Sequence, residues 1–224
     1  MQPITLKAIQ EIKFLNKECS EGCHIKTNDI RKLSARLYQT IKAKSIQSML
    51  PLCEELLEQR DWALGVIAYD WAYRIKKHYS IETFPIFEAW LIKYVRGWGD
   101  CDDFCTHAFG ELLCQYPELI ESIIPWTHRE EFWLRRAAAV ILIPAIRKDK
   151  LNKAIPFQIS DLLLMDEHDL VLKGYGWMLK VFSLKEPGMV YNYLESHTDD
   201  MPRVAFRYAL EKLDKQLRTE LMQK

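Results

Sequence analysis

The chain places tryptophans close to charged residues at three separated positions. Trp98 precedes Asp102 by four residues, and Trp133 precedes Arg136 by three. Trp177 ends a short segment that contains two glycines. An indole face attracts a cation, a carboxylate stabilises a developing positive charge, and a guanidinium binds phosphate in a bidentate manner. If these groups meet in space, they suit a cationic or electron-poor aromatic ligand that is attached to a phosphate.

The intervals between the three tryptophans predict how the groups are brought together. Trp133 follows Trp98 by 35 residues, and Trp177 follows Trp133 by 44. These intervals are typical of helix-pair repeats such as HEAT or armadillo repeats. Successive repeats of a solenoid stack side by side, so that equivalent positions line one concave surface. We therefore expect an all-α superhelical solenoid of HEAT-like helix-pair repeats.

Apolar residues recur at helical spacing along most of the chain. Clear stripes lie at 62–76, 87–94, 101–112 and 133–144, and no segment alternates apolar and polar residues over the length of a strand. Prolines and glycines are predicted to divide 45–215 into helices of roughly 10–18 residues. The predicted breaks lie at Pro51, 97–99, Pro117, Pro125, Pro156, 187–188 and Pro202.

Helix starts and domain boundaries can also be predicted. Thr83 is expected to begin one helix, and Ser160-Asp161 another. One domain is expected over 1–224, because no Pro/Ser-rich linker divides the chain. Its expected parts are an N-terminal helical cap (1–42), the repeats (43–215) and a polar tail (216–224).

The overall charge is zero, with 31 Lys and Arg against 31 Asp and Glu. This balance counts against a uniformly basic nucleic-acid-binding domain. The distribution is uneven, however: 129–153 and 203–218 are rich in basic residues, whereas acidic residues gather at 54–61 and 161–169. We expect one basic face on a neutral protein, with ordinary solvated helix surfaces as the alternative.

The remaining sequence features indicate a cytoplasmic protein without a metal or an organic cofactor. No apolar run reaches the ~20 residues that span a bilayer, and the N-terminus does not resemble a signal peptide. Cys101 and Cys105 are expected to pack as small apolar side chains. Cys19, Cys23 and His24 form a weak metal-like cluster that has no second ligand pair at zinc-finger spacing.

Five segments, in their order and spacing, resemble the HEAT-like-repeat DNA alkylation repair enzymes, the AlkD-type 3-methyladenine/7-methylguanine DNA glycosylases. The segments are 61–65, 98–105, 132–138, 173–177 and 202–210. The resemblance extends from about residue 45 to residue 212. It implies a monomer that binds alkylated duplex DNA on its concave face and hydrolyses the N-glycosidic bond of cationic alkylated purines.

The resemblance assigns roles to particular residues. The catalytic tryptophan and aspartate of the family fall on Trp98 and Asp102, and the second site tryptophan falls on Trp177. The arginine of the family falls on Arg136, although which of Arg135 and Arg136 faces the groove stays open. The complete set of expected DNA contacts is Arg135, Arg136, Lys173, Arg203 and Arg207.

The expected chemistry follows from the charge of the substrate. An alkylated purine is already a cationic leaving group, so the reaction requires no general acid. Asp102 would stabilise the positive charge that grows on the deoxyribose, and the indoles of Trp98 and Trp177 would hold the cationic unit. Arg136 would bind a neighbouring phosphate. No lysine occupies the position of a Schiff-base nucleophile, with Lys173 as a remote candidate, so a monofunctional enzyme is expected.

Alternatives remain at single residues and for the whole protein. Asp103 is a candidate partner of an arginine, and His107 fits a structural role. Trp177 fits plain core packing, and the other tryptophans are assigned to packing between repeats: Trp62, Trp71, Trp90, Trp126 and Trp133. The protein could instead bind distorted or branched DNA without chemistry, or act as a protein–protein scaffold.

Overall fold

The computed structural model describes residues 1–18 and 25–223, and these residues form helices without any strand. The predicted all-α class is therefore confirmed. None of the described helices is long and apolar enough to cross a membrane. Cys19, Cys23 and His24 lie outside the described residues.

The first half of the chain forms helices that lie between short loops. They are α1 (Pro3–Glu18), α2 (Thr27–Thr40), α3 (Ile46–Leu57), α4 (Trp62–Arg74), α5 (Thr83–Lys93), α6 (Trp98–Thr106) and α7 (Ala108–Gln115), with a 3-10 helix at Lys76–His78. The second half continues this pattern. It contains a 3-10 helix at Pro117–His128, α8 (Phe132–Val140), α9 (Ile143–Arg147), α10 (Ile155–Leu163), α11 (Asp169–Ser183), α12 (Pro187–Ser196), α13 (Arg203–Leu210) and α14 (Lys215–Gln223).

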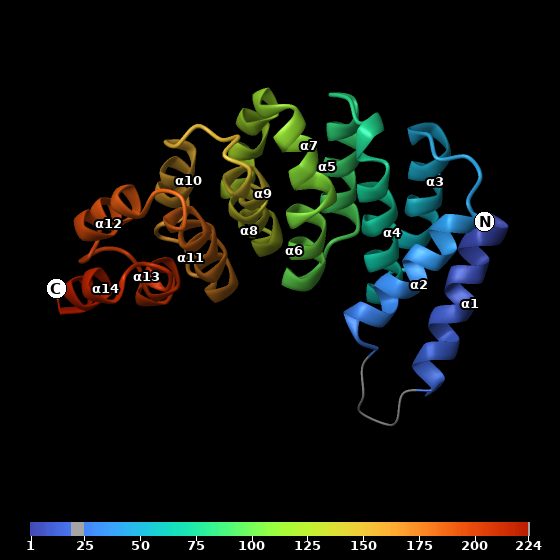
Figure 1. Cartoon of the computed structure of the whole chain (residues 1–224), viewed down its shortest axis with the longest axis horizontal. Helices are drawn as coiled ribbons and strands as arrows, with labels where there is room; N and C mark the ends of the chain where they lie inside the picture. The colour runs from blue at the N-terminus through green and yellow to red at the C-terminus, as the bar shows by residue number, and fades with distance from the viewer. Residues whose placement is uncertain (19–24, 224) are drawn as a thin grey trace.

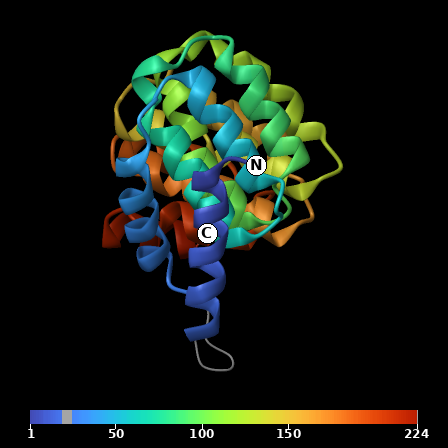
Figure 2. The ribbon, with the colours of Figure 1, turned by 90° about the vertical axis from the view of Figure 1, so that its right-hand side faces the viewer.

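The helices follow one another along an arc whose two ends carry the chain termini (Figure 1). One row of the arc consists of α2, α4, α6, α8, α11 and α13, and each helix of this row packs against the next. The other helices flank this row, with α3 against α4, α7 against α9 and α12 against α11. Viewed from the N-terminal end, successive helices lie behind one another (Figure 2). This arrangement confirms the predicted helical-repeat solenoid.

Bonds between successive helices of the row recur at a nearly constant interval in the sequence. The Ser34 hydroxyl donates to an Asp70 carboxylate oxygen at 2.5 Å, across 36 residues. The Trp71 indole donates to the Ser34 carbonyl at 3.2 Å, across 37 residues. The interval of 35 residues from Trp98 to Trp133 therefore reflects one repeat. The longer interval to Trp177 arises because α9 and α10 both lie between α8 and α11.

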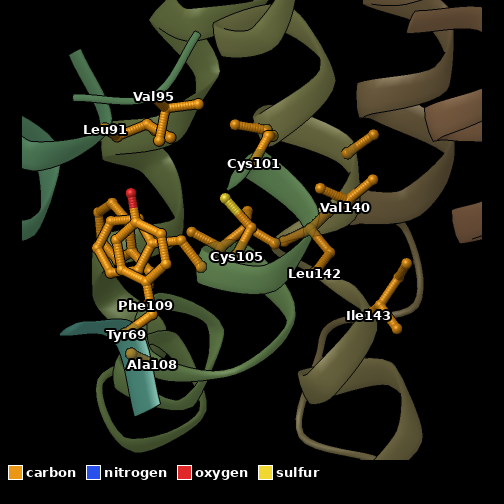
Figure 3. Close-up of a cluster of buried hydrophobic side chains, with 14 of the residues drawn as sticks. Tyr69, Leu91, Val95, Cys101, Cys105, Ala108, Phe109, Val140, Leu142 and Ile143 are labelled. Carbon is orange, nitrogen blue, oxygen red and sulfur yellow. The ribbon is translucent and has the colours of Figure 1, made fainter. Parts of the chain in front are cut away.

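An apolar core runs through the array between the helices. Figure 3 shows part of it, where α4, α6, α7 and α8 contribute neighbouring side chains. The rings of Tyr69 and Phe104 stack here with centroids 4.5 Å apart. Cys101 and Cys105 are fully buried free thiols in the same cluster, which confirms their predicted role as small apolar side chains.

Several helix ends follow from the local sequence. Thr83 begins α5, as predicted, and the Asp61 carboxylate accepts from the Leu64 amide to cap α4. The predicted start at Ser160-Asp161 is wrong, because both residues lie inside α10. Proline 156 stands in the first turn of that helix, where a missing amide proton costs no intrahelical bond.

Two other predicted breaks are also wrong. Pro51 lies inside α3, and Pro125 lies inside the 3-10 helix that spans 117–128. In α3 the flanking apolar side chains Leu50 and Leu52 are buried, and this tertiary packing outweighs the bond that the proline removes. The predicted polar tail is a helix, α14, which buries Leu221 completely.

Tight packing between α7 and its neighbours makes Gly110 indispensable. A Cβ at this position would lie 2.3 Å from the Cys105 carbonyl oxygen and 2.7 Å from Pro144 Cγ. Gly188, in α12, has no atom within 4 Å of the equivalent Cβ. The two glycines therefore provide a matched pair for testing the packing.

We predict that Gly110→Ala lowers the free energy of unfolding by about 2 kcal/mol or more, because the backbone must shift. Gly188→Ala should leave it unchanged or raise it by up to ~1 kcal/mol, since alanine favours a helix. Urea denaturation followed by circular dichroism measures both. Equal effects of the two substitutions would contradict the packing described for α7.

Candidate functional site

The central feature of the site is an ion pair between α6 and α8. The Arg136 guanidinium donates from Nε to Asp102 Oδ1 and from Nη2 to Asp102 Oδ2, each at 2.7 Å. The Arg136 side chain is 6% exposed, and the Asp102 side chain is 18% exposed. The fork-to-fork geometry fixes the plane and the direction of the carboxylate.

The repeat explains why these two side chains meet. Asp102 is the fifth residue of α6, and Arg136 is the fifth residue of α8. Equivalent positions of neighbouring helices in a solenoid face one another. Burial lowers the pKa of Arg136, but the hydrogen bond to Asp102 and the charge of Asp102, with contributions from the neighbouring cysteines, together hold the pKa above its usual value. The cation is therefore permanent, and it needs its carboxylate partner.

The same guanidinium extends the site to α11. Arg136 Nη1 donates to the Leu170 carbonyl oxygen. A Cβ at Gly174 would lie 3.1 Å from Arg136 Cγ and 3.3 Å from Nη1. The glycine therefore allows α11 to approach the ion pair closely. A glycine inside a helical pattern is a signal for such an approach, but the sequence did not indicate which side chain it accommodates.

The two candidate tryptophans lie on α6 and α11, the helices that contribute Asp102 and the backbone acceptor of Arg136. Trp98 is the first residue of α6, four residues before Asp102, and is 56% exposed. Trp177 follows Gly174 by three residues on α11 and is half-buried against the core. The ion pair thus lies between the helices that carry the two indoles. Trp98 offers an open ring face, whereas part of Trp177 serves packing.

Arg135 occupies a different environment from its neighbour. Its Nε donates to Asp166 Oδ2 at 2.5 Å, and its Nη1 donates to the carbonyl oxygens of Arg129 and Glu130 at 2.8 and 2.7 Å. These bonds link the start of α8 to the loop before α11. In this structure both Arg135 and Arg136 face protein acceptors, so neither presents a free guanidinium to a phosphate.

The basic stretch 129–153 is largely neutralised, in four of its five ion pairs by acids outside the stretch. Five of its seven basic side chains form ion pairs, and the pairs are Arg129–Glu131, Arg135–Asp166, Arg136–Asp102, Lys148–Glu111 and Lys153–Glu186. Lys173 is paired with Asp169 at the interval of one helical turn. The expected basic face does not therefore extend over this stretch, because side chains from other helices balance it.

Unpaired cations remain at the C-terminal end of the array. Arg203 and Arg207 are exposed on one side of α13 and make no ion pair among the described residues. The Arg203 guanidinium lies over the Phe206 ring at 5.2 Å from its centroid. Arg207 lines a shallow surface hollow together with Lys215 and Arg218. This part of the surface is the strongest candidate for contact with an anionic backbone.

Asp103 belongs to a separate network on the other side of α6. It pairs with Arg31, in agreement with the arginine partner suggested by the sequence, and its Oδ1 lies 3.3 Å from His107 Nδ1. Burial raises the pKa of Asp103, and the Arg31 charge opposes this rise. Asp70 accepts from Arg74 in the same network. These contacts tie α2, α4 and α6 together and separate Asp103 from Asp102.

The tryptophans assigned to packing behave in two ways. Trp71, Trp90 and Trp126 are buried, which confirms their assignment. Trp62 is 43% exposed at the start of α4, so packing against the start of α6 accounts for only part of its surface. The sequence feature that could have indicated this exposure is position, because Trp62 and Trp98 are each the first residue of a helix in the same row.

The arrangement has a limited chemical repertoire. It offers a fixed carboxylate, an adjacent indole face and a peripheral set of cations. Among the described residues, no group of three or more His, Cys, Asp or Glu side chains could hold a metal ion. The functional group best suited to catalysis is therefore the Asp102 carboxylate, which can stabilise positive charge or orient a water molecule.

The ion pair should contribute strongly to stability. We predict that Asp102→Ala lowers the free energy of unfolding by about 3 kcal/mol, because it leaves a buried guanidinium without its counter-charge. The double variant Asp102→Ala/Arg136→Met should recover much of this loss in a double-mutant cycle. Asp169→Ala, which breaks a pair on the surface, should cost at most ~0.5 kcal/mol. A comparable loss in Asp169→Ala and Asp102→Ala would refute the structural role of the pair.

Comparison with known proteins places this geometry in a family. The family model described as DNA alkylation repair enzyme matches residues 10–213. Among solved structures, a predicted DNA alkylation repair enzyme from Enterococcus faecalis has 19% identity and a TM-score of 0.73, with 96% of this chain and 97% of that chain covered. AlkD2 from Streptococcus mutans has 18% identity and a TM-score of 0.64, with 92% and 99% covered. No curated protein matches the chain. Because the family match covers most of its length, the chain belongs to the DNA alkylation repair enzyme family.

Proposed function

We propose that the protein is a monofunctional DNA glycosylase. It would release cationic alkylated purines, such as 7-methylguanine and 3-methyladenine, from duplex DNA by hydrolysis of the N-glycosidic bond. The observation that carries this proposal is the Asp102 carboxylate, which Arg136 fixes beside the exposed indole of Trp98. A monomer without metal or organic cofactor suffices for this chemistry.

Asp102 keeps acceptor capacity despite its bonds to Arg136. A carboxylate has about four lone-pair sites on its two oxygens, and Arg136 occupies one site on each oxygen. The remaining sites would face the sugar and a water molecule. As the glycosidic bond stretches, negative charge near C1′ stabilises the oxocarbenium-like state. Arg136 acts in this scheme as a positioning residue, because it orients the carboxylate without contacting the substrate.

The other groups would bind and orient the DNA. Trp98 offers a ring face for a cationic sugar–base unit through cation–π contact, and Trp177 would contribute its exposed edge. Arg203 and Arg207 would contact phosphates, since no acid of the described residues neutralises them. Lys173 is a weaker candidate, because it must exchange its bond to Asp169 for one to a phosphate.

A second candidate function is recognition of distorted or branched DNA without chemistry. One observation favours it: Arg136 compensates the charge of Asp102 within the protein, and this reduces the field that the carboxylate exerts on a sugar. In that case the cations on α13 would supply the affinity. The two functions differ in the requirement for a negative charge at position 102.

Release of 7-methylguanine from methylated duplex DNA tests the proposal. Asp102→Asn should lower the rate of release by at least about 100-fold, because the amide retains an acceptor for Arg136 but loses the negative charge. Asp29→Asn is the matched control, since Asp29 lies on α2 in an exposed pair with Lys32. Unchanged release by folded Asp102→Asn would refute the assigned mechanism. No release by the native protein would favour the non-catalytic function.

Absence of a lyase step is a separate prediction. Lys173 donates to Asp169, and this bond raises the pKa of its ammonium group, which disfavours the neutral amine that a Schiff base requires. Sodium borohydride added during the reaction should therefore trap no covalent protein–DNA adduct. Intact abasic strands should accumulate on denaturing gels. A trapped adduct that disappears in Lys173→Ala would contradict this prediction.

A further inference from the structure

A small cavity lies beside the candidate site, between the first turns of α4 and α6. Its volume is about 140 Å³. Its polar and aromatic lining residues are Arg60, Asp61, Trp62, Tyr69, Tyr94, Arg96 and Asp100, of which Asp61 already caps α4. Asp100 lies two residues after Trp98, so the cavity and the exposed indole involve the same first turn of α6, although Trp98 does not line the cavity. Pockets for drug-sized ligands measure ~300–1,000 Å³, so this cavity suits a single planar ring system.

Tyr69 is a buried residue that lines the cavity, and its hydroxyl oxygen is not among the fully buried atoms that lack a partner. The residue is 2% exposed, and its hydroxyl forms no hydrogen bond within the described part of the chain. Its ring is fixed by stacking on Phe104, and its oxygen lies at the end of the ring away from Ala108 in Figure 3. A phenolic hydroxyl can both donate and accept a hydrogen bond. A ligand in the cavity that Tyr69 lines would provide a partner.

The Asp100 carboxyl group is the second polar group of the cavity, and it accepts a hydrogen bond from the Arg96 backbone amide. It forms no ion pair with any described residue, although Arg60 and Arg96 line the same cavity. Both arginines donate to backbone carbonyl oxygens instead, including that of Lys93. Burial raises the pKa of Asp100 above its usual value. A partly buried carboxyl group without a counter-ion keeps lone pairs that can accept hydrogen bonds from a ligand.

Trp62 supplies an aromatic wall, and its position is explained by the repeat. It is the first residue of α4, as Trp98 is the first residue of α6. A Cβ at Gly99 would lie 3.8 Å from Trp62 Nε1, so the start of α6 lies directly against this indole. With 43% of its surface exposed, Trp62 can stack on a planar ligand.

We propose that Trp62, Tyr69 and Asp100 form a subsite for an unpaired nucleobase that carries an amino group on its Watson–Crick edge. The inference rests on the proposed function only in taking DNA as the ligand. Proteins recognise an unstacked base by aromatic stacking and by hydrogen bonds to that edge. The subsite adds a base-recognition element to a site otherwise built around the sugar and the backbone.

Cytosine fits the two polar groups. Its amino group would donate to the Asp100 carboxylate, a pairing that proteins also use in the major groove. The Tyr69 hydroxyl would donate to N3. Uracil has the same ring size but presents a carbonyl oxygen where cytosine has its amino group, so that oxygen would face the carboxylate. A comparison of cytosine with uracil therefore separates hydrogen bonding to the Watson–Crick edge from stacking of the ring.

Binding to duplexes that contain no excisable base tests the subsite. Each duplex carries a tetrahydrofuran abasic analogue opposite either cytosine or uracil, and fluorescence anisotropy gives the two dissociation constants. The native protein should bind the cytosine duplex about three- to tenfold more tightly, the range expected for one hydrogen bond. Asp100→Asn should abolish this preference, because an amide can rotate to donate to uracil or to accept from cytosine.

Further variants separate the subsite from general DNA binding. Tyr69→Phe should weaken binding of the cytosine duplex about threefold or more, since only the hydroxyl is lost. Asp199→Asn, at an exposed loop position, should keep the native preference. Equal binding of both duplexes by the native protein, or an unchanged preference in Asp100→Asn, would overturn the subsite. If the native protein prefers the cytosine duplex but releases no alkylated purine, only the glycosylase function is refuted.

Discussion

The ion pair between Asp102 and Arg136 is the interaction on which the site depends. It joins α6 to α8 through two bonds of 2.7 Å, and the same guanidinium reaches the backbone of α11 through Leu170. Three consecutive helices of the row thereby have a fixed register. A carboxylate that is bonded on both oxygens to a buried cation cannot rotate freely, so the fold itself orients the group that would perform the chemistry.

The repeat also determines where charge is available. Neighbouring helices present equivalent positions to each other, so charged side chains in the middle of the array find partners one repeat away. Arg136 and Lys148 are neutralised in this manner by Asp102 and Glu111, across 34 and 37 residues. The last helices have no further repeat beyond them, and cations such as Arg207 stay unpaired there among the described residues. The exposed cations of α13 are therefore the best placed of the described residues to contact an anionic ligand.

The sequence predicts the helical class and the approximate repeat length, because both depend on periodicity. It also identifies the Trp98–Asp102 combination, because four residues make one helical turn. The partner of Arg136 is not predictable in the same way, since the pairing depends on the register between two helices. The exposure of Trp62 has the same origin: an aromatic residue at a helix start packs or stays open according to what the neighbouring repeat covers. Pro51 shows the reverse, because tertiary packing preserves a helix that local propensity disfavours.

The first residues of three successive helices in the row are aromatic: Trp62 on α4, Trp98 on α6 and Phe132 on α8. Only two of these rings are open to a ligand. Phe132 stacks on His168 with ring centroids 4.0 Å apart and is half-buried, so the loop before α11 covers it. The exposed aromatic rings are therefore those of Trp62 and Trp98, on the side of the cavity at Asp100, and none is exposed at the start of α8. Contacts to a base would lie on the N-terminal side of Asp102, and contacts to phosphates on its C-terminal side.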